Sequence, residues 1–252
     1  MKMAGLVTLI TGGSRGLGKA IAIAYAQEGA KVIVTARQNT PTGLSGTALG
    51  TAQIITAMGG SAIGLPCDVT DEEQVNTVIN QIMNQYGKID VLVNNAGLMI
   101  PCEPFLAIEP KRWDELMQVN IRGPYLTCRA VVPIMMKQSS GSIVNIGSNA
   151  AIEHRWGGTA YCASKAALHM FNQCLAEELK EYNIAVNVLS PGGLKSEGSN
   201  AIPWAHTNTQ QPWHGRVEPD ECGPAAISLA LHSGKTLTGS VVARADYKKT
   251  WS

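Results

Sequence analysis

Short runs of apolar residues recur along the chain, and between them apolar residues return at helical spacing. An uninterrupted apolar run of strand length is typical of a strand that is buried on both faces, as in a parallel sheet. The pattern predicts strands at 6–10, 31–35, 62–67, 89–94, 142–146, 184–189 and 239–243, and helices at 19–27, 71–86, 110–137, 160–182 and 219–231. Because strands and helices alternate, we expect an α/β fold: one doubly wound parallel sheet with helices on both faces, forming a single domain over residues 1–252.

A glycine-rich segment follows the first predicted strand. It reads TGGSRGLG from Thr11 to Gly18 and leads directly into the first predicted helix. Glycine allows a tight turn and a close approach of the backbone to a pyrophosphate, whose charge is stabilised by the free N–H groups of a helix N-terminus. The segment therefore predicts a Rossmann-like domain that binds a dinucleotide at the carboxyl ends of its strands.

A second pattern combines a phenol, an ammonium and a hydroxyl. Tyr161 and Lys165 are four residues apart, and Ser148 lies thirteen residues before Tyr161. Residues i and i+4 share one face of a helix, so the charge of Lys165 can lie beside the phenol. A nearby cation favours the phenolate, and we therefore expect Lys165 to lower the pKa of Tyr161 from about 10. Alone, the spacing also fits a solvated lysine beside a half-buried tyrosine.

With these motifs in this order, the chain resembles the short-chain dehydrogenase/reductase family. Asn94-Asn95-Ala96-Gly97 follows the apolar residues Val91-Leu92-Val93 of the fourth predicted strand, and Asn120 lies in the next predicted helix. The match extends from about Leu6 to Ser196. The resemblance implies that Tyr161 is the general acid or base, that Ser148 holds the substrate oxygen, and that Lys165 binds the nicotinamide ribose. Asn120 would support a proton-relay water beside Lys165.

The resemblance also implies a set of cofactor-binding residues that extends beyond the glycine segment. Pro191-Gly192 closes the sixth predicted strand, and Ser196 stands where the family often has threonine. The expected set is Gly12, Ser14, Arg15, Gly16, Leu17, Gly18, Arg37, Asp68, Val69, Asn95, Ala96, Gly97, Tyr161, Lys165, Pro191, Gly192 and Ser196.

The end of the second predicted strand indicates which dinucleotide is bound. Domains that select NAD usually place an acidic residue about 20 residues after the glycine motif, where it bonds the ribose 2′-hydroxyl. Here the strand leads to Arg37, and Arg15 lies within the glycine turn. Two guanidinium groups can bind a 2′-phosphate, so NADP(H) is expected in preference to NAD(H). The alternative is that either arginine is a solvated surface charge.

Composition narrows the class of partner. The formal net charge is +1 and 15% of the residues are charged, which gives no reason to expect nucleic acid or an anionic membrane. No apolar run reaches the 18 or more residues of a membrane span. The six cysteines include no C-x-x-C pair, so we expect buried free thiols and no metal site. The expected partner is a small molecule, and the expected location is the cytoplasm.

Two segments are predicted to be loops. Residues 38–50 would lie near the adenosine, and residues 193–217 would cover the substrate, although an ordinary surface loop is the alternative. Candidate pocket residues, by position, are Leu98, Met99, Ala150, His154, Trp156 and Gly193. The stretches 124–137 and 160–179 are apolar on more than one face. By the family resemblance we expect a homo-oligomer, a tetramer or a dimer; deeper burial within a monomer is the alternative.

The sequence therefore predicts an NADP(H)-dependent oxidoreductase that transfers hydride between nicotinamide and a ketone, an aldehyde or a secondary alcohol. A 3-oxoacyl thioester reductase is one alternative, weakened because the segment after the last strand, Val241 to Asp246, lacks the glycine pair of many such reductases. A catalytically silent NADP(H) sensor is another, and the intact Ser148, Tyr161 and Lys165 argue against it.

Overall fold

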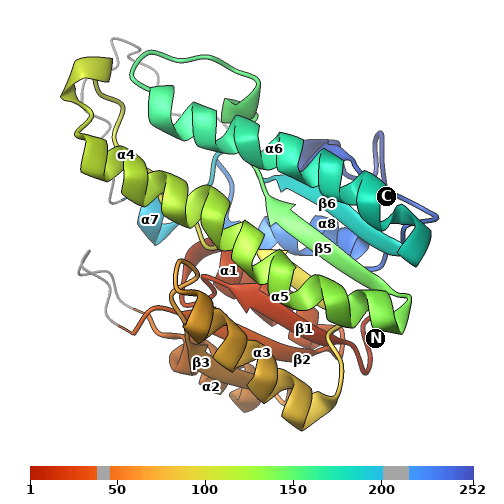
Figure 1. Cartoon of the computed structure of the whole chain (residues 1–252). Coiled ribbons are helices and arrows are strands. Elements are labelled where there is room, and N and C mark those ends of the chain that lie inside the picture. Colours follow the sequence, from red (N-terminus) through yellow and green to blue (C-terminus); the bar gives the residue numbers. More distant parts are fainter. Residues whose placement is uncertain (39–45, 201–215) are drawn as a thin grey trace.

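Residues 1–38, 46–200 and 216–252 are described by this computed structural model, and within them seven parallel strands form one sheet (Figure 1). The spatial order is β3-β2-β1-β4-β5-β6-β7. The strands are β1 (Val7–Thr11), β2 (Lys31–Ala36), β3 (Ser61–Pro66), β4 (Val91–Asn94), β5 (Gly141–Ile146), β6 (Ile184–Ser190) and β7 (Val241–Ala243). The order of the strands reverses between β1 and β4, and such a switch point opens a crevice at the carboxyl ends. The predicted α/β fold is confirmed.

Helices cover both faces of the sheet (Figure 1). On one face lie α1 (Gly16–Gln27), α2 (Ala48–Ala57) and α8 (Gly223–Ala230). On the other lie α3 (Glu72–Tyr86), α5 (Gly123–Gln138) and α6 (Thr159–Leu179). The shorter helices are α4 (Pro110–Met117) and α7 (Glu197–Asn200). Single helical turns are η1 (Phe105–Ala107), η2 (Gln118–Arg122), η3 (Asn149–Ala151), η4 (Lys180–Tyr182), η5 (Pro219–Cys222) and η6 (Arg244–Asp246).

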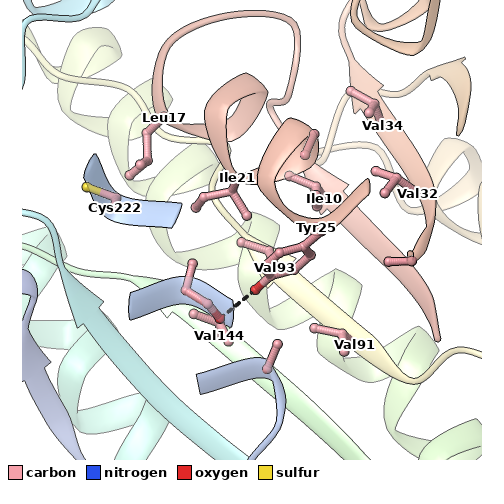
Figure 2. Close-up of a cluster of buried hydrophobic side chains, with 14 of the residues drawn as sticks. Ile10, Leu17, Ile21, Tyr25, Val32, Val34, Val91, Val93, Val144 and Cys222 are labelled. Atoms are coloured by element: carbon pink, nitrogen blue, oxygen red, sulfur yellow. Dashed lines mark hydrogen bonds between the residues drawn. The ribbon is translucent and has the colours of Figure 1, made fainter. Parts of the chain in front are cut away.

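The packing of α1 fixes the glycine turn that precedes it. Ile21 and Tyr25 are fully buried against Ile10 of β1 (Figure 2). The Tyr25 hydroxyl donates a hydrogen bond of 2.9 Å to the carbonyl of Ala226 in α8. A buried hydroxyl needs such a partner because its desolvation is otherwise uncompensated. The bond and the apolar contacts together hold the N-terminus of α1 at the carboxyl end of β1.

Two predicted segments differ from the structure. The loop predicted at 38–50 ends earlier, because α2 begins at Ala48; residues 39–45 lie outside the described residues. Helix α2 contains Gly50 and several β-branched residues, which lower its intrinsic helix propensity. Its stability comes from the Thr47 side chain, which caps Gly50 N–H at 2.9 Å, and from its buried alanines. The helix predicted at 110–137 is α4, the π-helical turn η2 and α5 in succession.

The helix lengths and the cysteine environments can be compared with the predictions made from composition. No helix in the three described ranges has the length and apolar character needed to cross a bilayer. All six cysteines are free thiols. Cys67, Cys128 and Cys222 are buried as predicted. Contrary to the prediction, Cys102 and Cys162 are half-buried and Cys174 is exposed.

Candidate active site

The glycine turn and the loop after β4 pack too closely for any side chain between them. Gly12 has a φ of +65°, and a Cβ there would lie 2.7 Å from the Ala96 Cα. A Cβ on Gly18 would lie 2.3 Å from the Asn95 side-chain nitrogen. The Thr11 hydroxyl accepts hydrogen bonds of 3.1 Å from the backbone N–H groups of both Asn95 and Ala96. The two loops therefore form one rigid unit at the switch point.

The N-terminus of α1 has the properties of an anion site. Arg15, at the N-cap position, makes no side-chain hydrogen bond to the first turn, so that turn is not capped as helices usually are. Instead, the Glu197 carboxylate from α7 accepts the Gly16 N–H at 3.0 Å. A carboxylate at this position demonstrates that the helix end receives an anionic oxygen. The arrangement fits a dinucleotide pyrophosphate, which would be held by backbone N–H groups.

The other predicted cofactor residues of the glycine segment and of β2 lie around this unit. Thr11 pairs with Thr35, and the Gly13 N–H donates to the Thr35 carbonyl at 3.0 Å, so Arg37 leaves β2 beside the glycine turn. The Arg37 side chain is exposed. Ser14 and Leu17 are buried, and Leu17 belongs to the core cluster in Figure 2. Leu17 can therefore contribute only its backbone to a ligand.

Asp68 and Val69 follow β3. The Asp68 carboxylate accepts hydrogen bonds from the N–H and the hydroxyl of Thr70, at 2.9 and 2.8 Å. It therefore stabilises its own turn, while Asp71 provides the helix cap of α3. Val69 is buried, and a Cβ on Gly123 would lie 2.8 Å from its methyl group.

Ser148, Tyr161 and Lys165 come together at the carboxyl end of β5. Ser148 caps η3 by accepting the Ala150 N–H at 3.1 Å. The Ser148 side chain interacts with Tyr161 and lowers its pKa. The Lys165 ammonium lies 5.7 Å from the centre of the Tyr161 ring and donates to the Ile146 carbonyl at 2.9 Å. The three groups predicted from their spacing thus form one cluster.

Asn120 lies behind this cluster, in the π-helical turn η2. Its side-chain oxygen accepts the Leu98 N–H at 2.7 Å, and its amide donates to the Leu98 carbonyl and to Ser164 Oγ at 2.9 and 3.0 Å. A Cβ on Gly97 would lie 3.6 Å from this oxygen and 3.9 Å from the Lys165 nitrogen. Asn120 therefore fixes the loop that runs past Lys165, and its role toward a relay water stays a prediction.

The segment after β6 reaches the glycine turn at Gly16. Gly192 has a φ of +77°, which favours glycine, and the Pro191 carbonyl accepts a bond from Arg244 at 3.2 Å. Ser196 lies at the glycine turn, since a Cβ on Gly16 would be 3.2 Å from the Ser196 Cβ. A groove of about 830 Å³ opens beside this contact, between α1, η5 and α8, and not at Tyr161.

Comparison with known proteins decides the family. The model of the short chain dehydrogenase family matches residues 6–205. The chain belongs to the short-chain dehydrogenase/reductase family. It is 33% identical to the 3-oxoacyl-[acyl-carrier-protein] reductase FabG of Thermotoga maritima, with 96% of this chain and 97% of that protein aligned. It is 35% identical to the 2,3-dihydro-2,3-dihydroxybenzoate dehydrogenase of Bacillus subtilis, over 91% of this chain and 85% of that protein.

A solved structure gives the same answer for the fold. A metagenomic short-chain oxidoreductase, crystallised in complex with NADP, matches with a TM-score of 0.78 and 29% identity over 96% of this chain and 98% of that chain. The predicted family is confirmed. The NADP in the crystal structure of the metagenomic oxidoreductase is the dinucleotide that Arg37 predicts for the present chain. The differently named relatives do not assign a substrate.

The electrostatics of this family member differ from the expectation for Tyr161 and Lys165. Burial raises the pKa of Tyr161, and the groups that lower it are Ser148 and Arg155. Burial also lowers the pKa of Lys165 to about 8, because an ammonium is costly in a dry environment. The prediction that Lys165 lowers the pKa of Tyr161 is not supported, since the ammonium is directed at the Ile146 carbonyl.

Several residues of the site region were not predicted. Arg216 donates to the Leu194 carbonyl at 2.6 Å and to Ser199 Oγ at 2.9 Å, which anchors the start of α7. His169 lies beneath Ser148. Neither position carries a sequence signal, because both act through residues distant along the chain.

The predicted pocket positions have mixed outcomes. Ala150 is buried, at 2% exposure, and so it does not line an open pocket. Its methyl group packs inward because Ala150 forms part of the turn capped by Ser148. Leu98, Met99 and Gly193 are half-buried, whereas His154 and Trp156 are exposed. Part of the predicted substrate loop, 201–215, lies outside the described residues.

Proposed function

We propose that the chain is an NADP(H)-dependent oxidoreductase that interconverts a ketone or an aldehyde with the corresponding alcohol. The convergence of Ser148, Tyr161 and Lys165 beside the glycine turn carries this proposal. Bound nicotinamide supplies or accepts the hydride. Gly12, Gly16 and Gly18 would hold its pyrophosphate on backbone N–H groups, and Arg15 and Arg37 would hold the 2′-phosphate.

The chain's own residues provide the proton and the placement. In reduction, the Ser148 hydroxyl donates a hydrogen bond to the carbonyl oxygen, and Tyr161 transfers its proton to the same oxygen. In the reverse direction, the Tyr161 oxygen takes the proton of the alcohol. Lys165 would hold the ribose hydroxyls, and its positive charge lies 5.7 Å from the centre of the Tyr161 ring. With a lowered pKa of about 8, Lys165 loses this charge as the pH rises through that value.

A panel of carbonyl compounds tests the proposal. Ketones, aldehydes and an acetoacetyl thioester are each mixed with the purified chain and NADPH or NADH, and the absorbance of the reduced nicotinamide is followed. We expect NADPH to be oxidised with at least one ketone or aldehyde. Binding of NADPH without turnover of any carbonyl would instead support a nucleotide sensor and contradict the proposed activity.

A 3-oxoacyl thioester reductase is the second candidate. The Thermotoga maritima relative carries that name and aligns with 96% of this chain. The segment Val241 to Asp246, which comprises β7 and the turn after it, lacks the glycine pair of many such reductases. Turnover of the acetoacetyl thioester at a kcat/KM well above that of every simple ketone would favour this candidate.

We further propose that the chain forms a cytoplasmic homo-oligomer. Tyr125 of α5 and Met170 of α6 are 44% and 60% exposed, and both helices lie on the same face of the sheet (Figure 1). Large apolar side chains exposed in this way are typical of an interaction surface. The free thiols agree with a reducing compartment. In the single domain that we propose, residues 193–217 would cover the substrate.

Glu197 gives a prediction about cofactor affinity. Its carboxylate accepts the Gly16 N–H, the group that would bind the cofactor's pyrophosphate. Glu197→Gln should lower the Kd for NADPH by about fivefold, because one unit charge near a phosphate at a protein surface is worth about 1 kcal/mol. Fluorescence titration measures the Kd. Asp220→Asn removes an equal charge from another residue that lines the same groove, and it serves as the matched control. Equal Kd values for Glu197→Gln and the unmodified chain would contradict this account.

A further inference from the structure

His169 is a buried imidazole directly beneath the active-site serine. It follows Lys165 by four residues on α6, so the two side chains share one helix face. His169 is 8% exposed, and its Nε2 lies 3.5 Å from the Ser148 backbone nitrogen. A Cβ on Gly147 would come within 2.4 Å of the same Nε2. The imidazole thus packs on the Gly147–Ser148 peptide, and only glycine at 147 leaves room for it.

Two side chains of α6 therefore hold both ends of the segment that carries Ser148. Lys165 bonds the Ile146 carbonyl at 2.9 Å, at the end of β5. His169 faces the Ser148 N–H two residues later. The donor–acceptor distance of 3.5 Å is longer than that of an ordinary hydrogen bond from an N–H group. The contact therefore acts through packing and the dipole of the N–H as much as through a hydrogen bond. The position of the Ser148 hydroxyl depends on both contacts.

The surroundings of His169 favour its neutral form. Burial lowers its pKa, and the charge of Lys165 lowers it further. The other groups that face it are the Gly147–Ser148 backbone after β5 and the Val188 side chain of β6, neither of which titrates. Among the described residues, Lys165 is the ionisable group that acts on it. A neutral imidazole can present an unprotonated Nε2 to an N–H, whereas an imidazolium cannot.

We propose that His169 is a positioning residue that holds Ser148 in register with Tyr161 through its neutral Nε2. The proposal rests on the oxidoreductase function proposed above. Protonation turns Nε2 into a donor facing the Ser148 N–H and places a second positive charge beside Lys165. Ser148 then loses its support, and turnover falls as the pH decreases. The fall occurs below the ordinary histidine pKa of about 6.5, because burial and Lys165 shift the titration downward.

Two substitutions at His169 distinguish the effect of its hydrogen-bond acceptor from the effect of its side-chain volume. In His169→Gln the amide oxygen can accept the Ser148 N–H and does not titrate. In His169→Leu a similar volume remains without an acceptor. We expect His169→Leu to reduce kcat by about 10-fold or more, in line with the cost of small misplacements in active sites, with the Kd for NADPH unchanged. We expect His169→Gln to recover most of kcat and to lose the decrease at acidic pH.

Two measurements do not depend on turnover. An NMR titration of the imidazole in the full chain should give a pKa below the ordinary value, coincident with the acidic limb of kcat. Hydrogen exchange of the Ser148 amide should be faster in His169→Leu than in His169→Gln. The control is His232→Gln, at a half-buried histidine hydrogen-bonded to Thr236, and it should leave both the pH profile and the exchange unchanged.

The outcomes are distinct. Wild-type kcat, pH profile and Ser148 exchange in His169→Leu would overturn the proposal. A His169→Gln variant as impaired as His169→Leu would also overturn it, because the acceptor would then not be the property that matters. If no carbonyl is turned over by the unmodified chain, the proposed function fails, while the NMR titration and the exchange rates still decide whether His169 supports Ser148.

Discussion

Replacing Tyr161 with phenylalanine should reduce kcat for every accepted carbonyl by about 10² to 10⁴-fold, the usual contribution of a positioned general acid. Phenylalanine keeps the ring and removes the hydroxyl group that carries the transferred proton. The Kd for NADPH should change by less than about twofold, because the dinucleotide is held mainly by backbone N–H groups of the glycine turn. Steady-state kinetics and fluorescence titration measure the two quantities.

A matched control distinguishes chemistry from packing. Tyr182 lies at the end of the same helical stretch as Tyr161 and is 41% exposed. Tyr182→Phe also removes a phenolic hydroxyl and should leave kcat unchanged. The thermal unfolding temperature of both variants should match that of the unmodified chain. If Tyr161→Phe retained the full rate with every carbonyl, the proton would have to come from another group, and the proposed mechanism would be wrong.

The protonation state of Tyr161 determines whether the phenol can donate a proton, as reduction requires, or accept one, as oxidation requires. Burial raises its pKa, so the phenol keeps its proton throughout the neutral range. That form is the donor needed for reduction. Ser148 and Arg155 oppose the effect of burial.

The central strands β1, β4, β5 and β6 could be predicted from the sequence because they are buried on both faces. Residues 142–146 and 184–189 are mostly apolar, each with one buried asparagine, and the observed β5 and β6 extend them by one residue each. The glycine turn could be predicted for a similar reason: tight packing against Ala96 and Asn95 requires glycine at 12 and 18. In both cases a local pattern reflects a strict local constraint.

Features that depend on tertiary contacts could not be predicted. The π-helical turn at Gln118–Arg122 interrupts a stretch whose periodicity looks like one helix. Helix α2 has weak intrinsic propensity and is stabilised by packing. His169 reaches across 21 positions to Ser148, and Arg216 across 22 positions to Leu194. A single histidine or arginine gives no sign in the sequence of such a partner.

The second large effect expected from the structure concerns the choice of dinucleotide. Arg37 is exposed and leaves β2 beside the glycine turn, where the adenosine ribose of a bound dinucleotide is expected. Arg37→Asp should lower the ratio of kcat/KM for NADPH to that for NADH by about 100-fold or more. A charge-assisted bond to the 2′-phosphate contributes about 1.5–3 kcal/mol, and the new carboxylate adds repulsion. The same carboxylate can bond the 2′-hydroxyl of NADH.

The control uses the other end of the same strand. Lys31 begins β2 and is exposed, so Lys31→Asp makes the same change of charge at the amino end of that strand, away from the glycine turn. It should leave the ratio of the two kcat/KM values within about twofold, since charges separated by more than a Debye length are largely screened. An equal shift in both variants would indicate a general effect of net charge. A ratio unaffected by Arg37→Asp would contradict a role for Arg37 at the 2′-phosphate and leave Arg15, within the glycine turn, as the group to test.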